Sequence, residues 1–199
     1  MLLDASDSTL VLVDFQERLM PAIADSANIL RNAERLARLA AMFDVPLLAT
    51  EQNPARLGAT VQSLQALIPT RLSKAAFGAS EVLMPRLRPS PTAPRGNARS
   101  LPRHLQKPVE SEPARGSVVL AGCEAHVCVL QTALQLLEEE LDVWVVTDAC
   151  GSRTDRNRDA AFDRLAGAGC ELVTTEMVAF EWLGDSHHPR FKEALALIK

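Results

Sequence analysis

Short apolar runs rich in β-forming residues alternate with stretches of helical spacing along nearly the whole chain. Six such runs predict strands, at residues 9–13, 45–50, 70–73, 117–121, 142–147 and 171–175. The stretches between and after them predict helices at 26–43, 59–67, from about 79, 126–140, 154–168, from about 176 and from about 189. Strands that alternate with helices form βαβ units, in which helices cover both faces of a parallel sheet. We therefore predict an α/β fold of three αβα layers around a six-stranded parallel sheet, and we expect Ser26 to cap its first helix.

The length of 199 residues and the hydrophobic share of 47% suit one globular domain, so we predict a single domain over 1–199. One segment interrupts the alternation. Between Pro85 and Gly116 the chain holds seven prolines and almost no apolar periodicity. So long a stretch without regular structure is unusual inside a compact domain. We therefore predict a Pro-rich loop insertion at about 85–116.

Charge and hydropathy exclude several classes of partner. A net charge of −4 argues against nucleic acid, because phosphate-binding faces need clustered lysines and arginines. No apolar run approaches the ~18 residues of a membrane span, and an N-terminus with acidic Asp4 and no basic region is not a secretory signal. We expect a cytoplasmic protein with no nucleic-acid and no membrane partner. In a reducing compartment its cysteines are expected to be free thiols: Cys123, Cys128, Cys150 and Cys170.

Three predicted strands lead into residues that can do chemistry. Asp14 directly follows the first strand, Lys74 follows the third, and Cys128 lies in the first turn of the helix after the fourth. Ligands of open α/β sheets bind at the carboxyl ends of the strands, so these side chains converge if their strands are neighbours. The helix dipole and a nearby ammonium favour a thiolate, and we therefore expect a lowered pKa and a nucleophilic sulfur at Cys128. Asp14 is then the group that accepts the thiol proton and holds Lys74.

A structural interpretation competes with this one. A buried cysteine is most often a small hydrophobic residue. An aspartate at a strand end is often a cap, and a lone lysine is often a surface charge. A cysteine–histidine pair has little support, because His126 lies two residues before Cys128 and such side chains do not face each other on a helix. The residues by themselves leave both interpretations open.

Several segments together carry a resemblance to a known family. VLVDFQ, LSKAAFGA and AGCEAHVCVLQTAL resemble the three catalytic segments of the isochorismatase-like cysteine hydrolase superfamily. The stretches TEQNPARLGATV, VVTDACGSR and GDSHHPRFKEALALIK are most similar to the isochorismatase domain-containing proteins. The match spans nearly the whole chain. The Pro-rich segment departs from it, since this connection is shorter in the family.

The resemblance implies a Rossmann-like, isochorismatase-like hydrolase fold and a triad of Asp14, Lys74 and Cys128. It also implies a cis peptide bond between Cys123 and Glu124, which directs the backbone amides of Glu124 and Cys128 at an oxyanion.

Two departures from related enzymes narrow the chemistry. Nicotinamidases of the superfamily carry an Asp-x-His metal motif after the second strand, where this chain has Glu51, Gln52 and Asn53. We therefore expect no metal and no other cofactor, and we do not expect nicotinamide as substrate. Isochorismatases proper cleave a vinyl ether and lack the cysteine, so Cys128 points to an acyl carbon.

The predicted function is hydrolysis of a small amide-like C–N bond through a thioester. Cys128 attacks, Asp14 carries the proton and Lys74 supports both charges; Phe15, Gln52 and Phe77 flank these segments and are candidates for the substrate pocket. The alternative is a non-catalytic or redox-sensing scaffold that binds a partner and keeps a reactive thiol. A Cys128 far from the other two residues, or walled off from solvent, would favour that alternative.

The end of the chain favours self-association. The final predicted helix carries Phe191, Leu195, Leu197 and Ile198 outside a sheet whose faces are already covered. It must pack on the outside of its own domain or on a second subunit. We expect a homo-oligomer, dimer or larger, because closed symmetric assemblies are common among such enzymes.

Overall fold

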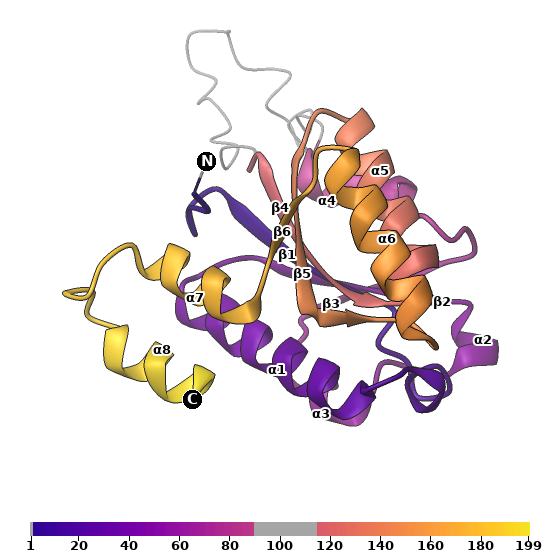
Figure 1. Cartoon of the computed structure of the whole chain (residues 1–199), viewed down its shortest axis with the longest axis horizontal. Coiled ribbons are helices and arrows are strands. Elements are labelled where there is room, and N and C mark those ends of the chain that lie inside the picture. Colours follow the sequence, from indigo (N-terminus) through magenta and orange to yellow (C-terminus); the bar gives the residue numbers. More distant parts are fainter. Residues whose placement is uncertain (1, 90–114) are drawn as a thin grey trace, which may run out of the picture.

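The computed structural model describes residues 2–89 and 115–199, and a single parallel sheet forms its centre (Figure 1). The strands are β1 (Ser8–Val13), β2 (Leu47–Gln52), β3 (Thr70–Lys74), β4 (Ser117–Cys123), β5 (Asp142–Gly151) and β6 (Glu171–Val173). They lie in the order β3-β2-β1-β4-β5-β6, and every neighbouring pair is parallel. The six-stranded parallel sheet predicted from the sequence is confirmed.

Helices cover both faces of this sheet (Figure 1). One face carries α1 (Ser26–Met42), α3 (Gln62–Gln65), α7 (Thr175–Leu183) and α8 (Phe191–Ile198). The other carries α4 (Ser80–Leu87), α5 (Leu130–Glu138) and α6 (Asp155–Gly167). The shorter helical pieces are a 3₁₀ turn (Met20–Ala22), α2 (Pro54–Leu57) and a π-helical turn directly before α5 (Ala125–Val129). The predicted αβα layering is therefore confirmed.

Each face of the sheet has its own apolar core. Successive side chains of a strand point to opposite faces, so Leu10 and Leu12 of β1 join the core of the α1 face, whereas Val11 and Val13 join that of the α5 face. All six residues of β1 are buried. This two-sided burial explains why the strand is a continuous apolar run in the sequence.

The strand order reverses between β1 and β4. The chain builds β1, β2 and β3 in one direction and then returns to place β4 on the other side of β1. The two strands approach closely at their carboxyl ends, where Val13 pairs with Gly122. Gly122 has φ +154°, and a Cβ atom there would lie 2.3 Å from the carbonyl oxygen of Val13. Only glycine fits this close approach, which brings the loops after β1 and β4 side by side.

Two predictions about helices need correction. Asp25, not Ser26, precedes α1 as its N-cap; its backbone is left-handed, and its carboxylate accepts a hydrogen bond from the Asn28 side chain instead of capping the helix. The helix expected at 59–67 is only the short α3. Its first part is held in another conformation because Thr60 donates its N–H and its hydroxyl to Glu51 Oε1.

The predicted insertion begins later than expected. Pro85 lies inside α4, which continues to Leu87. A proline in a helix removes one backbone hydrogen bond, and here the burial of Leu83 and Leu87 against the core holds the two turns together. The rest of the expected insertion, residues 90–114, lies outside the described residues.

The terminal helix α8 packs on its own domain. It lies beside α1 and α7 (Figure 1), and Phe191, Leu197 and Ile198 pack against the core of the α1 face. Trp182 of α7 meets Phe43 edge to face, with ring centroids 6.2 Å apart. The apolar residues of α8 are thus largely explained without a second subunit. Within residues 2–89 and 115–199, no helix is long and apolar enough to cross a bilayer.

Candidate active site

Asp14 and Lys74 form a buried ion pair at the carboxyl ends of the strands. Asp14 follows β1 and Lys74 ends β3, so the lysine reaches across the intervening strand β2. Its Nζ lies 2.7 Å from Oδ2 of Asp14, and the two side chains are 2% and 0% exposed. Desolvation makes such a pair costly unless its geometry and hydrogen bonds are good.

The backbone and a neighbouring strand fix the carboxylate of Asp14. Its φ of 55° turns the chain away from β1, and its N–H donates to the carbonyl of Thr50 at 3.1 Å. Oδ1 accepts a hydrogen bond of 2.7 Å from the Thr50 hydroxyl. Oδ2 is buried and, in the described part of the chain, has the charge of Lys74 beside it but no donor aligned for a hydrogen bond. One carboxylate oxygen is therefore committed, and the other is left to interact with a proton donor.

The ammonium of Lys74 is surrounded by acceptors. Besides Asp14, Nζ donates to Gln52 Oε1 at 2.7 Å, to the carbonyl of Phe77 at 3.0 Å and to that of Ala76 at 3.3 Å. These acceptors fix the position of Nζ beside Asp14. It can stabilise charge in this site but is poorly placed to remove a proton.

Cys128 lies in the π-helical turn that follows β4, and such turns are frequent at functional sites. Its thiol lies close enough to Asp14 and Lys74 for both side chains to shift its pKa. The residue is 6% exposed, so it is closely enclosed but not cut off from solvent. The structure thus brings the three residues together.

The expected lowering of the Cys128 pKa is wrong. Burial, and after it the charge of the Asp14 carboxylate, raise the pKa of this thiol to about 12, and the Lys74 ammonium only partly opposes them. Sequence reasoning counted the helix terminus and the lysine but not the desolvation of the sulfur. A thiol with this pKa needs a base to accept its proton.

The turn before Cys128 contains the cis peptide bond that the family resemblance implied. The Cys123–Glu124 peptide bond is cis. The N–H groups of Val127 and Val129 both donate to the carbonyl of Glu124. The Glu124 side chain is anchored elsewhere, because Arg153 binds it with two guanidinium nitrogens and its backbone N–H. These hydrogen bonds hold the pKa of Glu124 below its usual value.

The three candidate pocket residues differ in exposure and in hydrogen bonding. Phe15 is 1% exposed and packs in the core of the α1 face, so its side chain offers no surface to a ligand. Gln52 has both polar atoms engaged, Oε1 with Lys74 and Nε2 with the carbonyl of Ala75 at 2.6 Å. Phe77 is 54% exposed and adjoins Lys74 through its carbonyl. Gln52 is half-buried, so Phe77 is the most exposed of the three.

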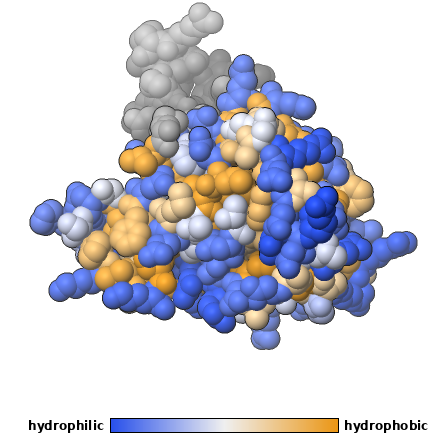
Figure 2. Space-filling view, viewed as in Figure 1, coloured by the Kyte–Doolittle hydropathy of each residue, from blue (hydrophilic) through white to orange (hydrophobic). Residues whose placement is uncertain are grey.

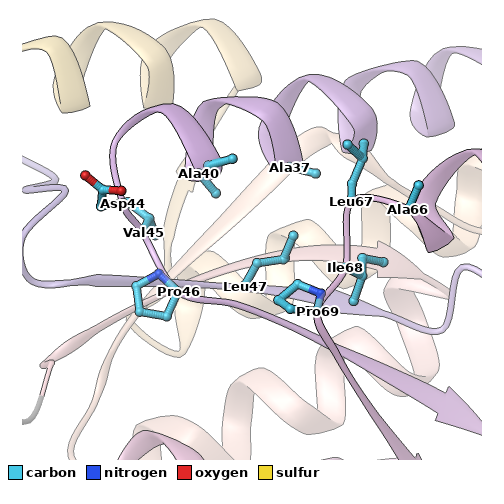
Figure 3. A pocket seen from close by; sticks show the side chains of 11 residues that line it. Ala37, Ala40, Asp44, Val45, Pro46, Leu47, Ala66, Leu67, Ile68 and Pro69 are labelled. Atoms are coloured by element: carbon cyan, nitrogen blue, oxygen red, sulfur yellow. The ribbon is translucent and has the colours of Figure 1, made fainter.

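Two hollows of the surface lie away from these residues. One of about 470 Å³ is at the amino ends of β2 and β3, lined by small and apolar side chains of α1 and the adjoining loops (Figure 3). Another of about 500 Å³ adjoins the end of β5, between Asp25 and Asn28 on one side and Arg158 and Phe162 on the other. Neither lining includes Asp14, Lys74 or Cys128.

The histidine near Cys128 has a structural partner. His126 Nδ1 lies 2.9 Å from the Ser152 hydroxyl, and this contact joins the turn after β4 to the loop after β5. Within residues 2–89 and 115–199, no group of three or more His, Cys, Asp or Glu side chains is arranged to hold a metal ion.

Sequence reasoning missed Thr50, which binds the carboxylate of Asp14. Thr50 lies near the carboxyl end of a strand, where reactive groups are expected. A lone threonine in a β-rich run is nevertheless typical of an ordinary strand residue. Only the position of β2 between β1 and β3 gives it a role.

Comparison with known proteins shows which family this sequence and fold resemble. Residues 8–177 match the Isochorismatase domain family. The chain is 38% identical to isochorismatase domain-containing protein 2 of Macaca fascicularis, over 96% of this chain and 83% of that protein. It is similar in structure to the MAR1 ribonuclease of Caenorhabditis elegans, with a TM-score of 0.81 and 31% identity, over 100% of this chain and 92% of that one. The YcaC gene product of Escherichia coli, described as an octameric hydrolase of unknown specificity, has a TM-score of 0.78 and 27% identity over 98% and 88% of the two chains.

Proposed function

The chain belongs to the isochorismatase family, and from that premise we propose that it is a cysteine hydrolase that cleaves a small amide-like C–N bond through a thioester. The observation that supports this most is the buried Asp14–Lys74 ion pair, which lies close enough to the thiol of Cys128 to shift its pKa. A thiol with a raised pKa needs an adjacent base to activate it, and the carboxylate of Asp14, with the Lys74 cation beside it, is in place to act as that base.

Acylation begins with proton transfer. Asp14 Oδ2 takes the proton of the Cys128 thiol as the sulfur attacks the acyl carbon, and an S–C bond forms. The carbonyl oxygen becomes an oxyanion, while the carboxylate charge of Asp14 is neutralised beside the Lys74 ammonium. When the tetrahedral intermediate collapses, the C–N bond breaks and the protonated Asp14 returns the proton to the leaving nitrogen. The products of this half-reaction are an amine and a thioester on Cys128.

Deacylation follows the same route in reverse. Asp14 accepts a proton from a water molecule as the oxygen attacks the thioester carbon. The S–C bond then breaks, the acid is released, and the proton returns from Asp14 to the sulfur. Lys74 stays in place throughout, because its amine donates to Gln52 Oε1 and to the carbonyl of Phe77. Each cycle therefore consumes one water and restores the resting protonation state.

The oxyanion needs donors of its own. The amides of Glu124 and Cys128 are our proposed pair, since they belong to the turn that carries the nucleophile. Val127 and Val129 are less suited because the carbonyl of Glu124 already accepts from both of their N–H groups. Preorganised backbone donors of this kind usually make the largest contribution to acyl transfer.

A panel of small substrates tests the proposal. Amides, carbamates and ureides are incubated with the wild type, with Cys128→Ala and with Cys170→Ala, and the released amine or ammonia is measured. Cys170 is a matched control because it is also a buried thiol, 6% exposed like Cys128, but lies before β6. We expect turnover by the wild type and by Cys170→Ala and none by Cys128→Ala. A mixed-sequence RNA belongs in the panel because the C. elegans relative is called a ribonuclease; RNA cleavage that survives Cys128→Ala would contradict the proposal.

The scaffold alternative has less support than catalysis. It required Cys128 to be remote from Asp14 and Lys74 or walled off, whereas the thiol adjoins both and is 6% exposed. Labelling of Cys128 without turnover of any substrate would favour that alternative.

We also propose that the protein forms a homo-oligomer. The argument no longer depends on α8, since that helix packs on its own domain. Support comes from the octameric E. coli relative and from Met177 and Phe180 of α7, which are 45% and 41% exposed. Apolar side chains gather in separate patches among hydrophilic ones on the face that Figure 2 shows. Sedimentation tests this: a single species near 21.6 kDa would show that the chain is a monomer.

A further inference from the structure

The turn that carries Cys128 lies beside the loop that follows β5. The two strands that lead into these segments are neighbours, and their last residues, Cys123 of β4 and Gly151 of β5, pair with each other. Glu124 and Ser152 are the next residues of the two segments. The parallel pairing therefore brings the turn and the loop out of the sheet together, so that side chains of one can bind the other.

Two side chains of the turn are bound by this loop. The Glu124 carboxylate, 7% exposed, accepts hydrogen bonds from the backbone N–H, Nε and Nη2 of Arg153 at 3.0, 3.0 and 2.6 Å. His126 Nδ1 lies 2.9 Å from the Ser152 hydroxyl. A guanidinium that binds a carboxylate through two nitrogens fixes its orientation as well as its position. The bound side chains belong to residues four and two positions before Cys128.

The loop after β5 is itself held against the core of the α1 face. Gly151 lies so close to that core that a Cβ atom there would be 2.4 Å from Ile29 and 2.6 Å from Ile23. The carbonyl of Ser152 accepts a hydrogen bond of 3.0 Å from the N–H of Ala24, and Ser152 is 1% exposed. The loop therefore has contacts of its own that keep it in place, and it can support the turn.

The backbone and the side chain of Glu124 have separate partners. Its carbonyl accepts from the N–H groups of Val127 and Val129, and these bonds shape the turn around Cys128. Its carboxylate is bound by Arg153. Its own N–H, one of the two proposed oxyanion donors, has no acceptor in the described part of the chain. Because these groups belong to one residue, binding of the carboxylate also restricts the direction of the N–H.

We propose that Arg153 and Ser152 are positioning residues that hold the turn through Glu124 and His126, and so direct the amides of Glu124 and Cys128 at the oxyanion. The inference rests on the proposed function, because the oxyanion belongs to that mechanism. It adds that the rate of acyl transfer depends on two residues of the loop after β5, neither of which is the nucleophile, the base or an oxyanion donor.

Two reactions of Cys128 separate this role from a general loosening of the turn. p-Nitrophenyl acetate acylates the sulfur: an S–C bond forms, the carbonyl oxygen becomes an oxyanion, the C–O bond breaks and p-nitrophenolate leaves. Iodoacetamide alkylates the same sulfur: an S–C bond forms as iodide leaves, and no oxyanion appears. In both reactions the thiol proton passes to Asp14. Misdirected amides should therefore slow acylation but not alkylation.

Arg153→Met removes both guanidinium contacts and leaves an apolar side chain. We expect acylation about 10- to 100-fold slower than in the wild type, an effect that a small displacement of catalytic groups can produce, and alkylation within about twofold. The Arg153 side chain is 64% exposed, so the free energy of unfolding should change little.

Both rates can be measured on the intact protein. Release of p-nitrophenolate gives the acylation rate after the rate of Cys128→Ala is subtracted. Alkylation is followed against pH by mass spectrometry, with peptide mapping to identify the labelled cysteine. Neither reagent requires the natural substrate to be known.

Arg158→Met is the matched control. Arg158 also binds a carboxylate through two nitrogens, that of Asp159, but both residues belong to α6. This variant should acylate at the wild-type rate. Ser152→Ala tests the second contact, because it removes the hydroxyl beside His126. It should also slow acylation, and its combination with Arg153→Met should be slower than either single variant.

The outcomes that overturn the inference are distinct from failure of the proposed function. Acylation of Arg153→Met at the wild-type rate would overturn it, as would equal slowing of acylation and alkylation, or equal slowing in Arg158→Met. An unchanged rate in Ser152→Ala would overturn the role of that residue. A wild type that releases p-nitrophenolate no faster than Cys128→Ala would contradict the proposed function itself, and the inference with it.

Discussion

The two ends of the sheet present opposite environments. At the carboxyl end, β1, β3 and β4 deliver a carboxylate, an ammonium and a thiol into a space where the ion-pair side chains are at most 2% exposed. At the amino end, the hollow of about 470 Å³ between α1 and the starts of β2 and β3 is open and is lined by apolar side chains apart from Asp44 (Figure 3).

The difference shows that volume is a poor guide to chemistry in this fold. A hollow lined by apolar residues leaves no charged group without water, so no interaction has to offset a desolvation cost there. A buried ion pair must overcome a desolvation cost of roughly several kcal/mol per ion. The buried pair of Asp14 and Lys74 lies at the edge of the sheet where the strand order reverses, the edge at which ligands bind in open α/β sheets. Substitutions at the carboxyl end should therefore change both the free energy of unfolding and the reactivity of Cys128. Substitutions at the amino end should change only the free energy of unfolding.

The largest expected effect is that of Lys74→Met. It leaves the Asp14 carboxylate buried without its cation, which should lower the free energy of unfolding by about 3–5 kcal/mol. Urea denaturation measures the change. The double variant Asp14→Asn/Lys74→Met removes both charges and should recover most of the loss. A double variant no more stable than Lys74→Met would show that packing, not the unpaired charge, causes the loss.

Asp14→Asn should affect reactivity more than stability. The ammonium of Lys74 keeps Gln52 and the carbonyl of Phe77 as acceptors, so less is left unpaired than in Lys74→Met. Loss of the carboxylate should lower the pKa of Cys128 from about 12 and speed its alkylation. Turnover of amides should fall by a factor of about 10²–10⁴, because the general base is gone. Slower alkylation together with slower turnover would contradict this division of roles.

A smaller effect is expected at the amino end. Ile68→Val enlarges the apolar hollow and should cost about 0.5–1.5 kcal/mol of unfolding free energy. It should leave the alkylation rate of Cys128 and its pH midpoint unchanged, since Ile68 packs in the core of the α1 face and Cys128 in that of the α5 face. A shifted midpoint would show that the two ends of the sheet are coupled.

The smallest effect concerns the ion pair of Glu124 and Arg153, whose arginine side chain is 64% exposed. The pKa of Glu124 is lowered from 4.5 by its hydrogen bonds to Arg153. The pair therefore stabilises the fold above that pH, and its contribution is lost as the pH falls through the lowered pKa. Arg153→Gln should be slightly less stable than the wild type at neutral pH and equally stable in acid. A difference that persists in acid would mean that Arg153 acts through packing.

The features that could be predicted from the sequence are those that depend on residues close together along the chain. The six strands, their parallel arrangement and the placement of Asp14, Lys74 and Cys128 at strand ends followed from apolar runs and from the polarity of parallel strands. The cis bond at Cys123–Glu124 and the triad came from a family resemblance rather than from physical reasoning. The site roles themselves stay predictions until the variants are measured.

What only the tertiary structure decided is the electrostatic state of the site. Sequence reasoning expected a reactive thiolate because it saw the helix terminus and the lysine, whereas burial and Asp14 raise the pKa of Cys128 to about 12. Nor did the pattern reveal Thr50, or that both polar atoms of Gln52 are engaged. Apolar periodicity is a property of neighbours along the chain. Desolvation and hydrogen bonding arise between strands that are neighbours only in the sheet, and β2 meets β1 and β3 there.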